Sequence, residues 1–110
     1  MSVPARVDLC GVEELRAAKR LTRWVEELRD ELTALFLDDG IRVLSTVCPH
    51  FGGELDGDGS SGELRCRWHG LRFDARTGSC RETRFKASLR RYEFALESGR
   101  VVVTIPDAMR

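Results

Sequence analysis

Apolar and polar residues alternate over several short stretches of the chain, which is the spacing typical of strands. Residues 7–10 alternate and end at Gly11, which predicts a short edge strand followed by a turn-like stretch over residues 12–15. Turn residues such as Asp38-Asp39-Gly40 separate later stretches that we also interpret as strands. These later predicted strands are residues 41–47, 63–67, 71–74, 89–96 and 100–105.

Residues 21–36 follow a different spacing. Their apolar side chains recur at intervals of three and four, and the Glu and Arg residues between them are good helix formers. The local pattern alone therefore predicts a helix. The residues that would share one helical face are Leu21, Trp24, Val25, Leu28, Leu32, Leu35 and Phe36.

Residues 55–62 are rich in Gly, Asp and Ser, which predicts a flexible polar connector with no strand character. Asp56 and Asp58 raise the possibility of a calcium loop. The flanking helices and the terminal Glu of an EF-hand are absent, so a solvated loop is the better interpretation.

Length and charge narrow the classes of function. A chain of 110 residues suits one domain, and its 18 basic and 18 acidic residues cancel, which argues against nucleic-acid binding and membrane adsorption. Residues 1–6 lack the basic and apolar runs of a signal peptide or membrane anchor, so we expect a cytoplasmic protein. In that reducing compartment, Cys10 and Cys80 are expected to be buried free thiols.

Both histidines of the chain lie beside cysteines in two short runs. Cys48-Pro49-His50 and Cys66-Arg67-Trp68-His69-Gly70 each offer one thiolate and one imidazole. Two cysteines and two histidines suit a [2Fe–2S] cluster that has Cys₂ on one iron and His₂ on the other. A closed Cys₂His₂ zinc site is the rival, but its usual spacing pairs Cys with Cys and His with His. The mixed order therefore favours iron.

This region resembles the Rieske iron–sulfur family, and the match extends to Gly52-Gly53 and Gly70 after the ligand runs. The resemblance implies an all-β fold: an antiparallel β-sandwich over residues 1–110, with two cluster loops in a small subdomain at about 46–75. It also implies a β-hairpin before the first ligand run. We therefore predict strands at 21–26 and 31–38, with a turn at 27–30, against the local helical pattern.

The resemblance further implies that Cys48 and Cys66 bind the inner iron of one [2Fe–2S] cluster and that His50 and His69 bind the outer iron. Respiratory members of the family have a disulfide between the loops and hydroxyl groups near the cluster sulfurs. This chain has other residues at those four positions, which places it with the ferredoxins and oxygenases and predicts a low reduction potential. The four residues are Gly53, Trp68, Leu71 and Phe73.

The function implied is that of a soluble ferredoxin, which carries one electron from a flavoprotein reductase to a terminal oxygenase of the ring-hydroxylating type. Two alternatives remain: a Rieske component of an oxygenase, and the small subunit of a nitrite reductase-like assembly. An oxygenase needs a mononuclear iron held by two further histidines and a carboxylate. His50 and His69 are the only histidines, so the chain is expected not to be an enzyme itself.

Overall fold

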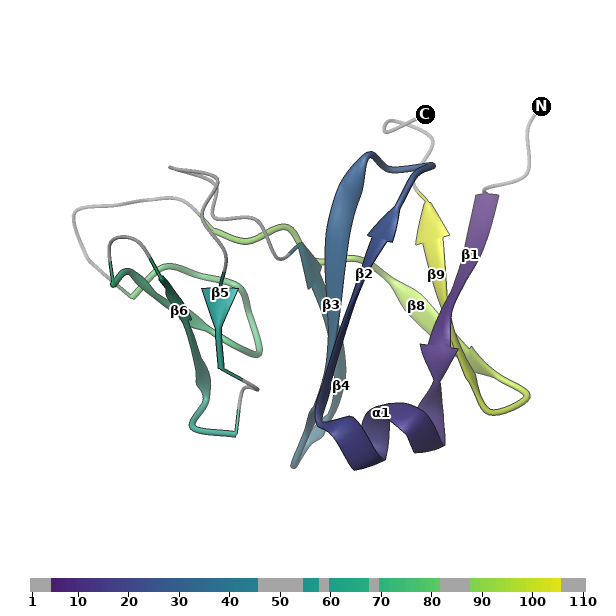
Figure 1. Cartoon of the computed structure of the whole chain (residues 1–110), viewed down its shortest axis with the longest axis horizontal. Helices are drawn as coiled ribbons and strands as arrows, with labels where there is room; N and C mark the ends of the chain where they lie inside the picture. The colour runs from purple at the N-terminus through teal and green to yellow at the C-terminus, as the bar shows by residue number, and fades with distance from the viewer. Residues whose placement is uncertain (1–4, 46–54, 58–59, 68–69, 82–87, 106–110) are drawn as a thin grey trace.

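The computed structural model describes residues 5–45, 55–57, 60–67, 70–81 and 88–105. These ranges contain nine strands and one helix (Figure 1). In chain order the elements are β1 (Ala5–Gly11), α1 (Val12–Ala18), β2 (Arg20–Val25), β3 (Asp30–Leu37), β4 (Gly40–Ser45), β5 (Leu55–Asp56), β6 (Glu63–Cys66), β7 (Arg72–Asp74), β8 (Phe94–Glu97) and β9 (Arg100–Ile105).

The strands form three antiparallel sheets of three strands each, in the orders β1-β9-β8, β2-β3-β4 and β5-β6-β7. Figure 1 shows them side by side, with the sheet β2-β3-β4 in the middle. One apolar core lies between this central sheet and the sheet β1-β9-β8. A second core lies between the central sheet and the small sheet β5-β6-β7. The predicted all-β, antiparallel fold is confirmed.

Strand β3 is buried on both of its faces, and this explains the misleading helical pattern. Leu32 and Ala34 belong to the first core, whereas Leu35 and Leu37 belong to the second. A strand with two buried faces has a nearly continuous apolar run instead of strict alternation. The strands predicted at 21–26 and 31–38 are therefore confirmed, and the helix suggested by the local pattern is wrong.

Helix α1 corrects the turn-like stretch predicted over residues 12–15. Leu15 is fully buried in the first core, and the Gly11 amide donates to the Glu14 carboxylate at 3.4 Å, which closes the first turn. Glu13 and Glu14 also suit the positive end of the helix dipole. The helix has seven residues, and no helix in the described ranges is long and apolar enough to cross a membrane.

Two other expectations need correction. Leu55 and Asp56 form β5 within the supposed connector, because Leu55 is buried in the second core and pairs with Cys66. The single strand expected over 89–96 is interrupted: only β8 pairs with β9, while Arg91 bridges to Leu44 of β4. Residues 88–93 thus pass from the edge of the central sheet to the edge of the outer sheet.

Candidate metal centre

Cys66 is the one predicted ligand that lies within the described residues. It ends β6, is fully buried, and faces the second core together with Leu64. The Cys66 amide donates to the Leu71 carbonyl at 2.8 Å, and the Gly70 amide donates to the Cys66 carbonyl at 2.9 Å. These bonds hold Cys66 at the base of a tight turn, as the resemblance implies for a ligand loop.

Gly70 has a structural reason to be glycine at the end of this turn. Its φ is +69°, a left-handed conformation that side chains with a Cβ rarely adopt, and no atom of the described residues stands within 4 Å of the position a Cβ would take. The backbone conformation alone therefore favours glycine here. A buried thiol at the base of a turn that closes on such a glycine fits a cluster ligand.

The other three predicted ligands, Cys48, His50 and His69, lie outside the described residues. Within the described ranges no three His, Cys, Asp or Glu side chains gather as a metal site. The described donor is thus a single thiol, which is compatible with a centre that takes its remaining ligands from the segments 46–54 and 68–69.

Strand β4 leads into the first ligand segment, and its last residue is firmly anchored. The Ser45 amide donates to the Arg90 carbonyl at 2.8 Å, and the Ser45 hydroxyl donates to the Asp30 carboxylate at 3.0 Å. The other Asp30 oxygen accepts from the Tyr92 hydroxyl at 2.7 Å. The chain therefore leaves the central sheet three residues before Cys48 from a fixed position.

The hydrogen bond between Tyr92 and Asp30 can be followed through the pKa of the Tyr92 hydroxyl. Burial, together with the hydrogen bond to Asp30, raises the pKa of Tyr92 to about 12. Because the pKa is higher in the folded than in the unfolded chain, its stabilising contribution is complete below about pH 10 and is lost as the pH rises toward about 12.

We expect a titration of tyrosinate absorbance to show a midpoint near pH 12 in the folded protein, and near pH 10 in denaturant. Tyr92 is the only tyrosine, so the signal has one source, and Tyr92→Phe provides the blank. A folded-state midpoint at the denatured value would mean that the bond to Asp30 is not formed in solution.

The small sheet is fastened to the central sheet by Arg20 of β2. Its guanidinium donates to the carbonyls of Leu55 and Gly57 at 2.7 Å each, and to the buried Thr33 hydroxyl at 2.9 Å. Bonds from a charged donor to two carbonyls fix β5 against β3. Arg20 thereby sets the position of β5, which pairs with Cys66. The pattern along β2 gave no sign of this role.

Arg67, next to Cys66 in sequence, forms an ion pair with Asp56 at 2.8 Å. The hydrogen bonds from Arg67 lower the pKa of the Asp56 carboxyl, against a smaller effect of burial. Both side chains are exposed, so the pair contributes little stability, but it links the turn after β6 to β5.

The opposite end of the small sheet is held by a turn built around Asp74. Its carboxylate accepts from the Arg76 and Thr77 amides at 2.8 and 3.0 Å. Burial pushes the Asp74 pKa upward, but these two amides and the Arg81 guanidinium outweigh it and keep the pKa below its ordinary value. The turn brings Cys80 beside Phe73.

Leu71 and Phe73 both lie in the second core with Cys66. Leu71 is 7% exposed and Phe73 is fully buried, so the surroundings of the thiol are apolar on the described side. Neither residue has a hydroxyl group. Cys10 is a buried free thiol, as expected; Cys80 is also free but only partly buried, so its expected burial is wrong.

A small antiparallel sheet carries a buried cysteine on a tight turn and packs on the larger sheets, an arrangement compatible with a metal- or cluster-binding β domain. The family model of the Rieske [2Fe-2S] domain matches residues 5–93, and the chain belongs to this family. The matched range includes all four predicted ligands.

Known proteins resemble the chain over different extents. Human apoptosis-inducing factor 3 is 35% identical over 71 residues, which make up 63% of this chain but only 12% of that protein. The ferredoxin of carbazole 1,9a-dioxygenase from Nocardioides aromaticivorans superposes with a TM-score of 0.73 at 23% identity, covering 96% of this chain and 100% of the ferredoxin.

A structure named as an NADH-dependent nitrite reductase small subunit, from Mycobacterium tuberculosis, has a TM-score of 0.68 at 18% identity. It covers 96% of this chain and 98% of that one. At these identities the two superpositions establish a shared fold. They place the chain among Rieske folds that include ferredoxins of oxygenase systems.

Proposed function

We propose that the chain is a Rieske-type ferredoxin that takes one electron from a flavoprotein reductase and delivers it to a terminal, ring-hydroxylating type oxygenase. The observation that carries this proposal is Cys66, which is buried at the base of the turn where the family has a cluster ligand. The overlap with a whole dioxygenase ferredoxin supports the carrier role. We also propose that it works in the cytoplasm.

The four ligands are proposed from the family pattern. Cys48 and Cys66 would hold the inner iron, and His50 and His69 the outer iron, of one [2Fe–2S] cluster per chain. Such a cluster supplies one-electron transfer at a potential above that of all-cysteine clusters. The chain contributes a buried thiol at Cys66, an apolar surround from Leu71 and Phe73, and a fixed approach through Ser45.

The small-subunit role in a nitrite reductase assembly is the second candidate, because a structure of that name covers nearly the whole chain. An oxygenase role for the chain itself is less well supported, since it has no histidine beyond His50 and His69 for a mononuclear iron.

The carrier proposal is tested by electron transfer in both directions. The purified, cluster-loaded protein should be reduced by a flavoprotein ferredoxin reductase with NADH or NADPH and should be reoxidised by a Rieske oxygenase in the presence of its substrate and oxygen. Substrate hydroxylation should require all three proteins. Hydroxylation by the isolated chain, or nitrite-dependent reoxidation with a large reductase subunit alone, would contradict the carrier role.

The apolar surround predicts a potential near the lower end of the Rieske range, at about −150 mV instead of about +300 mV. Leu71→Ser places a hydroxyl beside Cys66 and, combined with Phe73→Tyr, should raise the potential. Leu89→Ser is the control, because it adds a hydroxyl to the same core. Leu89 pairs with Gly78 and lies outside the turn that carries Cys66. Equal midpoints in the double variant and the control, measured with full clusters, would show that these hydroxyls do not reach the cluster.

A further inference from the structure

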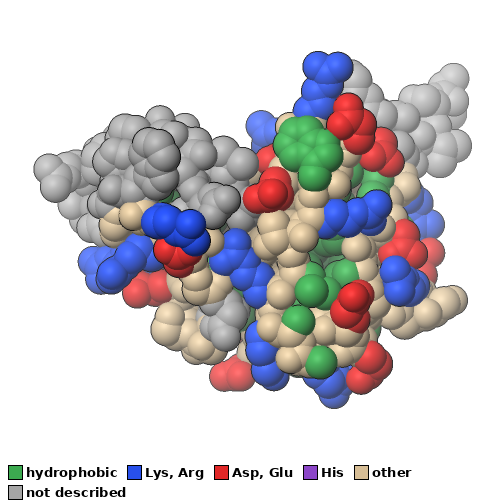
Figure 2. Space-filling model, viewed as in Figure 1, with side chains coloured by type: hydrophobic (Ala, Val, Ile, Leu, Met, Phe, Trp, Pro, Cys, Tyr) green, Lys and Arg blue, Asp and Glu red, His purple; other side chains and the backbone are tan. Residues whose placement is uncertain are grey.

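The structure describes fourteen arginines, and half of them pair with a nearby carboxylate. Figure 2 shows basic and acidic side chains interspersed over one face of the molecule. Seven arginines take part in ion pairs: Arg6, Arg16, Arg42, Arg67, Arg76, Arg81 and Arg100. Three of the other arginines line neighbouring clefts, which makes that part of the surface locally positive.

These three exposed arginines lie at the edge of the central sheet. Arg29, Arg90 and Arg91 make no ion pair with any carboxylate of the described residues, although Arg90 also hydrogen-bonds to the Tyr92 side chain. Arg29 and Arg90 line a cleft of about 340 Å³ that also contains Asp30. Both Asp30 oxygens already accept hydrogen bonds, from Tyr92 and from Ser45, so this carboxylate is engaged inside the fold.

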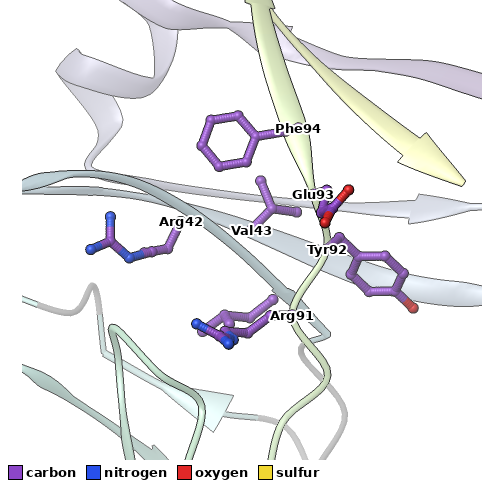
Figure 3. A pocket seen from close by; sticks show the side chains of 7 residues that line it. Arg42, Val43, Arg91, Tyr92, Glu93 and Phe94 are labelled. Carbon is purple, nitrogen blue, oxygen red and sulfur yellow. The ribbon is translucent and has the colours of Figure 1, made fainter. Parts of the chain in front are cut away.

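Arg91 lines a larger shallow cleft of about 710 Å³ together with Arg42, which is paired with Asp39 (Figure 3). The two guanidinium groups extend to the same side of the cleft, while Glu93 extends to the other. The floor is apolar, formed by Val43 and the half-buried Phe94. The cleft therefore has positively charged arginine side chains at its rims and an apolar base.

The edge of β4 offers little for strand pairing in this cleft. Arg42 donates to the Ile41 carbonyl at 3.0 Å and so covers an acceptor that an added strand would use. The Val43 carbonyl already accepts from the Tyr92 amide at 3.0 Å. An occupant would accordingly be recognised by its side chains, and the side chains that complement these rims are carboxylates.

We propose that the two neighbouring clefts, with Arg29, Arg90 and Arg91, are a docking surface for an acidic patch on the redox partner protein. The smaller cleft is lined by Ser45, the last described residue before the first ligand segment, so a partner seated there would contact the end of the strand that leads into that segment. The identity of the partner as a redox protein rests on the proposed carrier function. The whole chain carries equal numbers of basic and acidic residues, which argues for a local protein contact instead of nucleic acid.

Two double variants of equal net charge test the surface. Arg90→Gln with Arg91→Gln removes two charges from the clefts; Arg16→Gln with Lys19→Gln removes two charges that stack on Phe36, outside both clefts. The probe is a fluorescein-labelled polyglutamate peptide at low ionic strength, followed by anisotropy. We expect the cleft variant to bind roughly three- to tenfold more weakly and the control to match the wild type.

Equal weakening in the two variants would overturn the proposal, because binding would then follow net charge alone. Tighter binding of a single-stranded oligonucleotide than of polyglutamate, lost in the cleft variant, would also overturn it and assign the arginines to nucleic acid. Iron content is measured on the same samples. If the protein contained no cluster but still bound polyglutamate through the clefts, the proposed carrier function would be wrong and the proposed acid-binding surface would hold.

Discussion

Replacing Cys66 with serine is expected to abolish iron binding. Cys66 is proposed to supply one of two thiolates to the inner iron, and a serine hydroxyl is a much poorer ligand for iron in such clusters. Even loss of a group that only supports a ligand weakens metal binding roughly 10- to 100-fold, so loss of a ligand should cost at least as much. Iron analysis and the visible spectrum of the purified variant measure the effect.

Cys80→Ser is the matched control, since Cys80 is also a free cysteine that packs against the second core. It bridges to Phe73 but lies outside the ligand pattern. We expect this variant to keep its iron and its spectrum. If Cys66→Ser retained a full cluster, or if Cys80→Ser lost it, the assignment of Cys66 as a ligand would be wrong.

Gly78→Ala is expected to destabilise the fold by about 3 kcal/mol, the sum of a left-handed backbone penalty and an overpacking cost. Gly78 has a φ of +81°, and a Cβ there would stand 2.6 Å from the Leu89 carbonyl oxygen. The Leu89 amide also donates to the Gly78 carbonyl at 2.7 Å, so the two segments cannot separate without losing that bond. Chemical denaturation of variant and wild type measures the difference.

Gly99→Ala separates the two causes. Gly99 has a similar φ of +75°, but among the described residues no atom lies within 4 Å of its Cβ position. Only the backbone penalty applies there, so we expect a loss of about 1 kcal/mol. Equal losses for the two variants would show that the close approach of Gly78 to Leu89 is not a feature of the protein in solution.

The strands around Leu32 and Leu35 show where sequence patterns fall short. Burial on two faces removes the alternation that identifies a strand, so the period of the apolar residues indicated a helix. The hairpin was predicted only from the family resemblance, which rests on the ligand runs farther along the chain. Helix α1 was missed for the opposite reason: seven residues with one buried leucine give too short a pattern to distinguish from a turn.

The predicted ligands depended on residue type and spacing, which a sequence displays directly. The supports of the site do not appear in such patterns. Arg20 reaches the carbonyls of Leu55 and Gly57 across 35 and 37 positions, and Tyr92 meets Asp30 across 62. Pairings over such separations depend on how the sheets pack, and no local pattern records them. The same holds for the arginines that line the two clefts.

Metal and sulfide analysis of the purified protein, combined with electron paramagnetic resonance of the reduced form, tests the central claim most directly. The account predicts two irons and two acid-labile sulfides per chain, with the signal of a [2Fe–2S] cluster that has mixed cysteine and histidine ligands. One zinc per chain and no sulfide, after expression with adequate iron and sulfur, would contradict it.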